Sequence, residues 1–195
     1  PLVSTGKPVV LSASAVEAIA TCPLRWFLDR RLHAGPAGAT SAGYGSVVHA
    51  VIAGIIGGDI TEEQDAVERA LNSIWGELGY AATWESDVAK RRALADIQRF
   101  VAWRRSSART IVAAESGFDF PLQVQGQSVR LRGSVDILDA SDAADQPDVR
   151  VVDIKTGAQP PTKNATLTNV QLGTYQLAVQ NGAVAGFDVN SVLVG

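Results

Sequence analysis

The sequence predicts an α/β protein in which a mainly helical part, residues 1–114, precedes a sheet-containing part, residues 115–195. Hydrophobic residues recur at a period near 3.6 before Glu115 and near 2 after it, which indicates helices followed by strands. The 195 residues are 46% hydrophobic and 19% charged, which is enough apolar material for one sizeable core. We therefore expect a single domain over residues 1–195.

Helices account for most of the first part. They are expected over residues 15–32, 46–56, 61–79 and 86–114. Ser14 and Glu17 have the spacing of a capping box, which predicts the start of the first helix. The glycine-rich, uncharged stretch 35–45 predicts a loop.

Strands dominate the second part. Phe118, Phe120 and Leu122 alternate with polar residues, and the turn residues 125–127 follow, so a β-hairpin is expected. The core-facing residues of the return strand are expected to be Val129, Leu131, Val135 and Ile137. Beyond the hairpin we expect a loop over 141–148, a strand over 149–155, a helix over 167–180 and a last strand over 187–194.

Charge and apolar content exclude several classes of protein. The formal net charge is −3, so a nucleic acid would have to be held by a local patch or through bound metal rather than by bulk positive charge. The longest apolar stretch, 47–58, is interrupted by His49 and is too short for a membrane helix. Nothing near Pro1 has the charged start and apolar core of a secretory signal, and the single Cys22 excludes an internal disulfide framework. We expect a soluble, cytoplasmic protein.

The chain has no methionine and begins with Pro1. We interpret it as a fragment of a larger protein, truncated at the C-terminus directly after the last expected strand.

Acidic residues and a lysine fall together in the expected sheet. Asp153 and Lys155 are two residues apart in one strand, so their side chains would project from the same face. Asp136 lies in the non-core register of the preceding strand, and strand pairing would bring it beside Asp153. Two such carboxylates suit Mg²⁺ or Mn²⁺, which keep water and phosphate oxygens as their other ligands. A neighbouring amine would hold the attacking water or stabilise charge on phosphorus, as in a phosphodiesterase.

The Asp153–Lys155 spacing alone is also typical of a solvated salt bridge, so other residues have to support the site. Gln171 and Tyr175 are four residues apart, on one face of the helix that follows the strand. From there they can reach back to the site or to a nucleic-acid backbone. His49 lies among apolar neighbours, where a histidine is either a ligand or a satisfied core residue.

Six short segments occur in a fixed order along nearly the whole chain. They are Leu11-Ser12-Ala13-Ser14, Cys22-Pro23-Leu24-Arg25-Trp26-Phe27, Gly45 to His49, Gly133-Ser134-Val135-Asp136, Asp153-Ile154-Lys155-Thr156-Gly157, and Gln171 to Tyr175. Together they resemble the RecB-like branch of the PD-(D/E)XK nuclease superfamily, which includes AddB-type and CRISPR-associated exonucleases. The resemblance implies a restriction-endonuclease-like core, a central mixed sheet flanked by helices.

The resemblance also implies the metal ligands. His49, Asp136 and Asp153 would bind catalytic Mg²⁺ or Mn²⁺, and the backbone carbonyl of Ile154 would help. The superfamily's proline is replaced by Val135, a departure common among relatives.

Further residues would act around that metal. The resemblance implies that Lys155 serves the nucleophilic water and that Gln171 and Tyr175 complete the site and contact DNA. Glu115 lies where some relatives carry another acidic residue, and it is equally well explained as a charge at a strand end.

Iron–sulfur relatives place one cysteine before the nuclease core, where Cys22 stands, and three after it. This chain has only one cysteine, which cannot hold a 4Fe-4S cluster. Either the other ligands lie in a longer parent chain, which we expect, or Cys22 is a small buried hydrophobic residue.

Two functions remain open. In the first, the chain is the metal-dependent DNA exonuclease module of a helicase–nuclease, of the actinobacterial type, that processes double-strand breaks for recombination repair. The helicase motor would lie in the same parent chain or in a partner subunit. In the second, the domain is a catalytically silent DNA-binding or scaffold module, which would be expected to lose Asp136, Asp153 or Lys155. All three are present.

Seven basic residues and one acidic residue, Asp96, lie between Lys90 and Arg109. They could follow a phosphate backbone. On a helix they spread around the non-core side instead of forming one stripe, so we expect a solvated face.

Overall fold

The computed structural model describes residues 8–31, 39–141, 148–157, 159 and 161–188. The chain divides into two compact units. The sheet unit holds the strands together with helices from both ends of the chain. The helical unit holds residues from the middle of the chain and the short segment that begins at Ile154, so the boundary between the units falls directly after Asp153.

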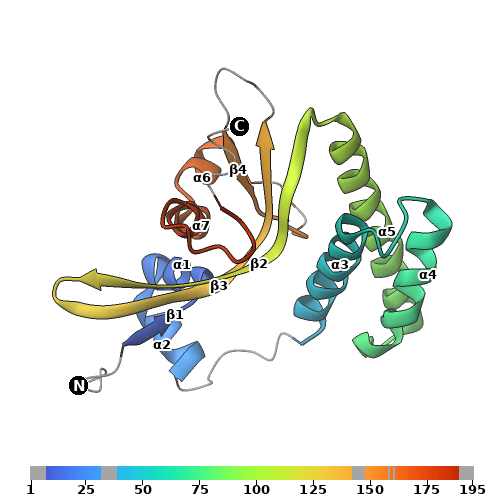
Figure 1. Cartoon of the computed structure of the whole chain (residues 1–195). Helices are drawn as coiled ribbons and strands as arrows, with labels where there is room; N and C mark the ends of the chain where they lie inside the picture. The colour runs from blue at the N-terminus through green and yellow to red at the C-terminus, as the bar shows by residue number, and fades with distance from the viewer. Residues whose placement is uncertain (1–7, 32–38, 142–147, 158, 160, 189–195) are drawn as a thin grey trace. The chain divides into compact units, whose positions relative to one another are not determined.

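One mixed sheet forms the centre of the sheet unit (Figure 1). Its strands are β1 (Val9–Leu11), β2 (Arg109–Val124), β3 (Gln127–Ser141) and β4 (Val149–Val152). β2 and β3 form the expected hairpin, whose turn residues Gln125 and Gly126 both have positive φ, the conformation of a tight two-residue turn. β1 pairs with β3 in parallel and β4 pairs with β3 antiparallel.

Helices from both ends of the chain complete the sheet unit. The N-terminal helices are α1 (Ala13–Thr21) and α2 (Pro23–Arg31), and the C-terminal ones are α6 (Lys163–Leu167) and α7 (Val170–Gln180). α1 and α7 contact each other and contribute Ala13, Tyr175 and Ala178 to one core with the strands. The predicted fold class, a central mixed sheet with helices packed on it, is therefore confirmed.

The core-facing register of β3 changes along the strand. Leu131, Val135 and Leu138 all belong to the core, whereas Ile137 is fully buried but is not a member of it. Because side chains alternate between the two faces of a strand, Val135 and Leu138 can share a face only if the alternation shifts by one residue between them. The expectation that Ile137 continues the register of Val135 was wrong, and Asp136 lies at the shift.

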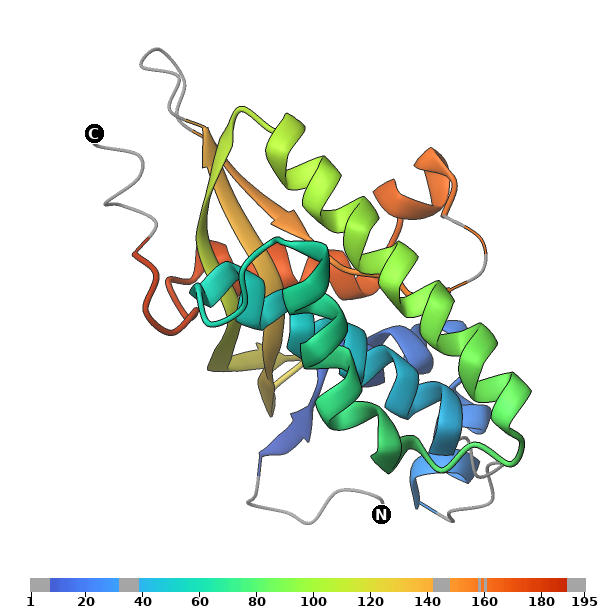
Figure 2. The ribbon, with the colours of Figure 1, turned by 90° about the vertical axis from the view of Figure 1, so that its right-hand side faces the viewer.

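The helical unit contains α3 (Ala39–Gly57), α4 (Gln64–Trp75), the 3-10 turn η1 (Gly76–Leu78) and α5 (Thr83–Ser106). These helices pack side by side (Figure 2). Periodicity places Ala93, Leu94, Ile97, Phe100 and Val101 on one arc of α5, and all of them are buried except Leu94, which is half-buried. No helix among the described residues is long and apolar enough to cross a membrane.

Several element boundaries differ from those expected. The helix expected over 15–32 is broken at Cys22, whose backbone is extended, because the residue before a proline avoids the helical region and Pro23 has no N–H to donate. α3 begins at Ala39, inside the expected loop.

The strands also differ from those expected. β2 begins at Arg109, before the expected change of period, and β1 was not predicted. Parts of the loop expected over 141–148 and of the strand expected over 187–194 lie outside the described residues. The two described residues of the latter, Phe187 and Asp188, are not in a strand.

Candidate functional site

The pairing of β3 with β4 leads directly to two acidic residues. The last pair at one end of the ladder is Ile137 with Val152. Asp136 and Asp153 are the next residues along the chain beyond this pair, so both acids lie at this end of the β3–β4 ladder. The charges of both residues also act on the hydroxyl of Tyr175 on α7.

Glu115 joins Asp136 from the other strand of the hairpin. Glu115 lies on β2, which pairs with β3. Their nearest ligand oxygens lie within 4.8 Å of each other. Glu115 has φ 45°, in the left-handed region that non-glycine residues seldom occupy. Such strain in a strand is typical of a functional position, so the functional interpretation of Glu115 gains support.

α7 supplies the predicted polar pair. Gln171 Nε2 donates a hydrogen bond of 2.7 Å to the hydroxyl of Tyr175, which is 5% exposed and meets Phe118 edge to face. Burial raises the pKa of Tyr175 to about 12, the Gln171 hydrogen bond opposes this, and the charges of Asp136, Asp153 and Glu115 raise it further. The phenol is therefore neutral at ordinary pH, and the acidic residues lie near enough to affect it.

The start of α7 is fixed by a side-chain bridge. Asn169 is its N-cap, and its Oδ1 accepts a hydrogen bond of 2.7 Å from the backbone N–H of Leu172. Its Nδ2 donates to Glu17 Oε1 of α1 at 2.9 Å. Because both ends of this amide are bonded, the first turn of α7, which carries Gln171, is held against α1.

In the helical unit, His49 lies beside the backbone that follows Asp153. Its Nε2 is 3.1 Å from the carbonyl oxygen of Ile154. Two neighbouring ligands on an octahedral ion with bonds of about 2.1 Å would be separated by about 3 Å. The two atoms therefore have the spacing of a ligand pair as well as that of a hydrogen bond.

Lys155 is exposed and does not lie in a strand. β4 ends at Val152, so the argument that Asp153 and Lys155 share a strand face was wrong. The segment that begins at Ile154 belongs to the helical unit, and the carbonyl oxygen of Ile154 is 3.1 Å from Nε2 of His49 on α3.

Two other residues bear on the site. Ser134, two residues before Asp136, has a buried hydroxyl without a hydrogen-bond partner among the described residues. A water molecule held by the carboxylates could satisfy it. Cys22 is half-buried at the end of α1 and forms no disulfide.

Sequence reasoning missed Arg92, which donates a hydrogen bond of 2.8 Å to the carbonyl of Thr156. It lies among the basic residues expected to form a solvated face. No local signal marks it, because its partner is a backbone atom far along the chain.

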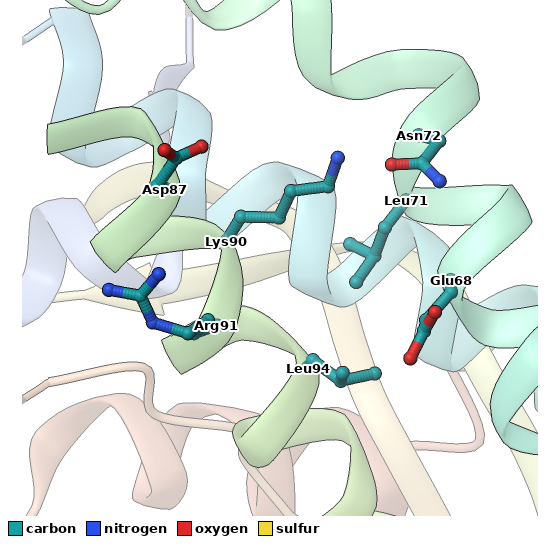
Figure 3. Close-up of a pocket in the computed structure, with 7 residues that line it drawn as sticks. All are labelled: Glu68, Leu71, Asn72, Asp87, Lys90, Arg91 and Leu94. Carbon is teal, nitrogen blue, oxygen red and sulfur yellow. The ribbon is translucent and has the colours of Figure 1, made fainter. Parts of the chain in front are cut away.

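A pocket of about 280 Å³ in the helical unit is separate from these residues (Figure 3). It lies between α4 and α5, and charges of both signs line it, including Glu68, Asp87 and Lys90. Lys90 extends toward Asn72 of α4, whereas Arg91 extends to the opposite side of α5 (Figure 3). With its charges mixed, the pocket indicates no particular ligand.

The donors of the predicted site fit a hard divalent cation. Oxygen atoms opposite each other on an ion with bonds of about 2.1 Å are about 4.2 Å apart, so the oxygens of Glu115 and Asp136 need little movement to share one. Asp153 supplies another carboxylate, and an imidazole and a carbonyl suit Mn²⁺ or a partly hydrated Mg²⁺.

The model of a family described as the PD-(D/E)XK nuclease superfamily matches residues 10–193. No curated protein matches the chain significantly.

Proposed function

The chain belongs to the PD-(D/E)XK nuclease superfamily, and from this premise we propose that it is a DNA nuclease that requires Mg²⁺ or Mn²⁺. Membership supports hydrolysis of phosphodiester bonds in general, and the fold agrees with the restriction-endonuclease-like architecture. The observation that supports the proposal is the group of acids at the end of the β3–β4 ladder, where ligand oxygens of Glu115 and Asp136 lie within 4.8 Å of each other and Asp153 directly follows β4. Carboxylates so close repel each other, and a shared divalent cation removes that cost.

We assign Asp136 and Asp153 as metal ligands, together with the imidazole of His49 and the carbonyl oxygen of Ile154. Glu115 is close enough to Asp136 to bind the same ion directly or through water. When bound, the metal would lower the pKa of a water molecule and stabilise negative charge on the phosphate.

The remaining residues would act on the water and the DNA. In the proposed reaction a water oxygen forms a bond to phosphorus, the bond from phosphorus to one sugar oxygen breaks, and that oxygen takes up a proton. The Lys155 ammonium would orient the water and stabilise the phosphate charge. Gln171 holds the Tyr175 hydroxyl in place, and the phenol, neutral at ordinary pH, can donate a hydrogen bond to a phosphate oxygen without adding negative charge.

The biological setting is a proposal from the resemblance of the six segments. We propose an exonuclease that trims DNA ends at double-strand breaks beside a helicase motor of the RecB or AddB type. The domain would then be one nuclease module of a larger protein. A 4Fe-4S cluster would require Cys22 together with three cysteines from a longer parent chain.

A cleavage assay tests the function. End-labelled linear duplex and single-stranded DNA are incubated with the protein in Mg²⁺, in Mn²⁺ and in EDTA, and Asp153→Asn is assayed beside the wild type. We expect cleavage only with metal and a loss of at least about 100-fold in the variant. The exposed Asp87→Asn in the helical unit removes the same charge and should retain full activity.

Two outcomes would contradict the proposal. Cleavage of equal rate in EDTA would show that no metal is needed. Metal-independent binding of DNA without any cleavage would favour the silent DNA-binding module instead.

A further inference from the structure

We propose that Arg92, supported by Tyr44, is a positioning residue that sets the place of Lys155. The inference rests on the proposed function, since Lys155 matters only if it acts in phosphodiester hydrolysis. Arg92 itself would touch neither DNA nor metal. It would act on the backbone that carries Lys155.

The carbonyl groups on both sides of Lys155 lie within hydrogen-bond distance of side chains of the helical unit. When the proposed metal is bound, the Ile154 carbonyl and His49 would be held by that ion instead. The carbonyl of Ile154 is 3.1 Å from Nε2 of His49 on α3. The carbonyl of Thr156 accepts a hydrogen bond of 2.8 Å from Nη2 of Arg92 on α5. A segment outside any strand or helix is thus held at two points that flank a single side chain.

α3 approaches this segment closely. Gly45 and His49 are four residues apart and lie on one face of the helix. A Cβ atom on Gly45 would be 3.4 Å from Oγ1 of Thr156, an ordinary van der Waals distance, so the backbone of α3 lies beside this side chain. The segment therefore also lies against α3 in addition to the two polar contacts.

Arg92 is held in turn by Tyr44. Its guanidinium carbon lies 5.5 Å from the centre of the Tyr44 ring, within the range of a cation–π contact. The Tyr44 hydroxyl donates a hydrogen bond of 2.6 Å to Oδ2 of Asp96, one turn further along α5. Since Tyr44 is 8% exposed, its ring is a fixed platform for the guanidinium.

A catalytic lysine gains from such a support. The Lys155 side chain is exposed, and its contribution to a transition state falls when the backbone that carries it moves. A displacement of about 1 Å at a reacting centre can cost up to about 100-fold in rate. When both neighbouring carbonyl groups are held, the Cα atom that carries the Lys155 side chain is limited to one position.

The test compares Arg92→Ala with Arg91→Ala. Both variants remove one exposed guanidinium from the same helix, but only Arg92 is bonded to Thr156. For Arg92→Ala we expect kcat to fall about 10- to 100-fold with KM unchanged within twofold. Arg91→Ala should change neither constant by more than about twofold. Arg92→Lys, which keeps a donor but loses the planar fork, should be intermediate.

Two further measurements separate positioning from other roles. In a Lys155→Ala background, Arg92→Ala should change single-turnover cleavage by less than about twofold, because the two residues act in series. Hydrogen exchange should be faster in Arg92→Ala than in the wild type for the peptide covering Asp153 to Gly157, and unchanged for Arg91→Ala.

Three results would overturn the inference. A raised KM and a weaker salt dependence with unchanged kcat would make Arg92 a phosphate contact. Full additivity with Lys155→Ala would mean that it acts elsewhere. Unchanged hydrogen exchange in both Arg92 variants would show that Arg92 does not hold the segment around Lys155 in place. If the wild type cuts no DNA, the proposed function fails, and hydrogen exchange alone still decides whether the segment is held.

Discussion

The phenol of Tyr44 gives the helical unit a stability that depends on pH. Burial raises the pKa of Tyr44 above its ordinary value of 10.0, and the hydrogen bond to Asp96 adds to the shift. The unfolded chain therefore loses this proton near pH 10, whereas the folded chain keeps it to higher pH. The resulting stabilisation is complete below pH 10 and is lost as the pH rises toward the folded-state pKa.

Tyr44→Phe isolates this contribution. The free energy of unfolding of the wild type, minus that of the variant, should fall by about 1.4 kcal/mol between pH 9 and pH 11. Urea titrations at both pH values measure it. The same difference at pH 9 and pH 11 would show that the folded state does not hold the proton.

Lys155→Ala tests the role of the amine. If Lys155 orients water or stabilises phosphate charge, kcat should fall by at least about 100-fold, because both effects act on the transition state. Calorimetric Mn²⁺ affinity should stay within about threefold, since the amine is not a ligand. Lys163→Ala, which removes an exposed lysine at the start of α6, is the matched control. Cleavage by Lys155→Ala at the wild-type rate would exclude the role.

At the scale of single residues, the sequence indicated the candidate side chains better than the tertiary contacts that surround them. The roles proposed for His49 and Tyr175 still await experiment. The spacing of Gln171 and Tyr175 was enough to place them together on a helix, because the partners of a local pair follow from helical periodicity. Arg92 could not be found in this way, since its partner Thr156 depends on tertiary structure.

The β3–β4 pair is stabilised beyond its ladder by a cross-strand ion pair. Asp139 is 1% exposed and lies opposite Arg150, which donates from Nε at 3.1 Å and from Nη2 at 2.5 Å. Removal of the guanidinium would leave a buried carboxylate without its cation. Arg150→Ala should therefore lower the free energy of unfolding by about 3 kcal/mol, measured by urea titration.

A second pair in the same sheet is the control. Arg130 on β3 and Asp119 on β2 also form an ion pair, but the Asp119 side chain is 38% exposed. Because solvent can replace the lost partner, Arg130→Ala should cost no more than about 1 kcal/mol. Equal losses in the two variants would show that burial of Asp139 does not set the cost.

At the scale of elements, periodicity predicted the hairpin and the core arc of α5, and it failed where a local rule or a distant partner intervened. Pro23 broke the first expected helix, and its restriction on Cys22 could have been read from the sequence. The early end of β4 could not, because the segment after it groups with helices far earlier in the chain. β1 is only three residues long, and so short a strand leaves little pattern.

For the whole molecule, the fold class was predictable because the change of hydrophobic period reflects which elements bury which faces. The division of the chain into two units was not predictable from the sequence. The segment that begins at Ile154 is grouped with helices far earlier in the chain, although it directly follows a strand. Such a grouping depends on long-range contacts of His49 and Arg92 that no local pattern encodes.

The central claim is that the acidic residues at the end of the β3–β4 ladder, Glu115, Asp136 and Asp153, bind a divalent cation. Mn²⁺ binding, measured by calorimetry on the wild type and on Asp136→Asn, tests it most directly. The substitution keeps the shape of the side chain and removes its charge. We predict a saturable site in the wild type and a loss of affinity of at least about tenfold in the variant. Equal affinity in both proteins, or no saturable binding in the wild type, would contradict the claim.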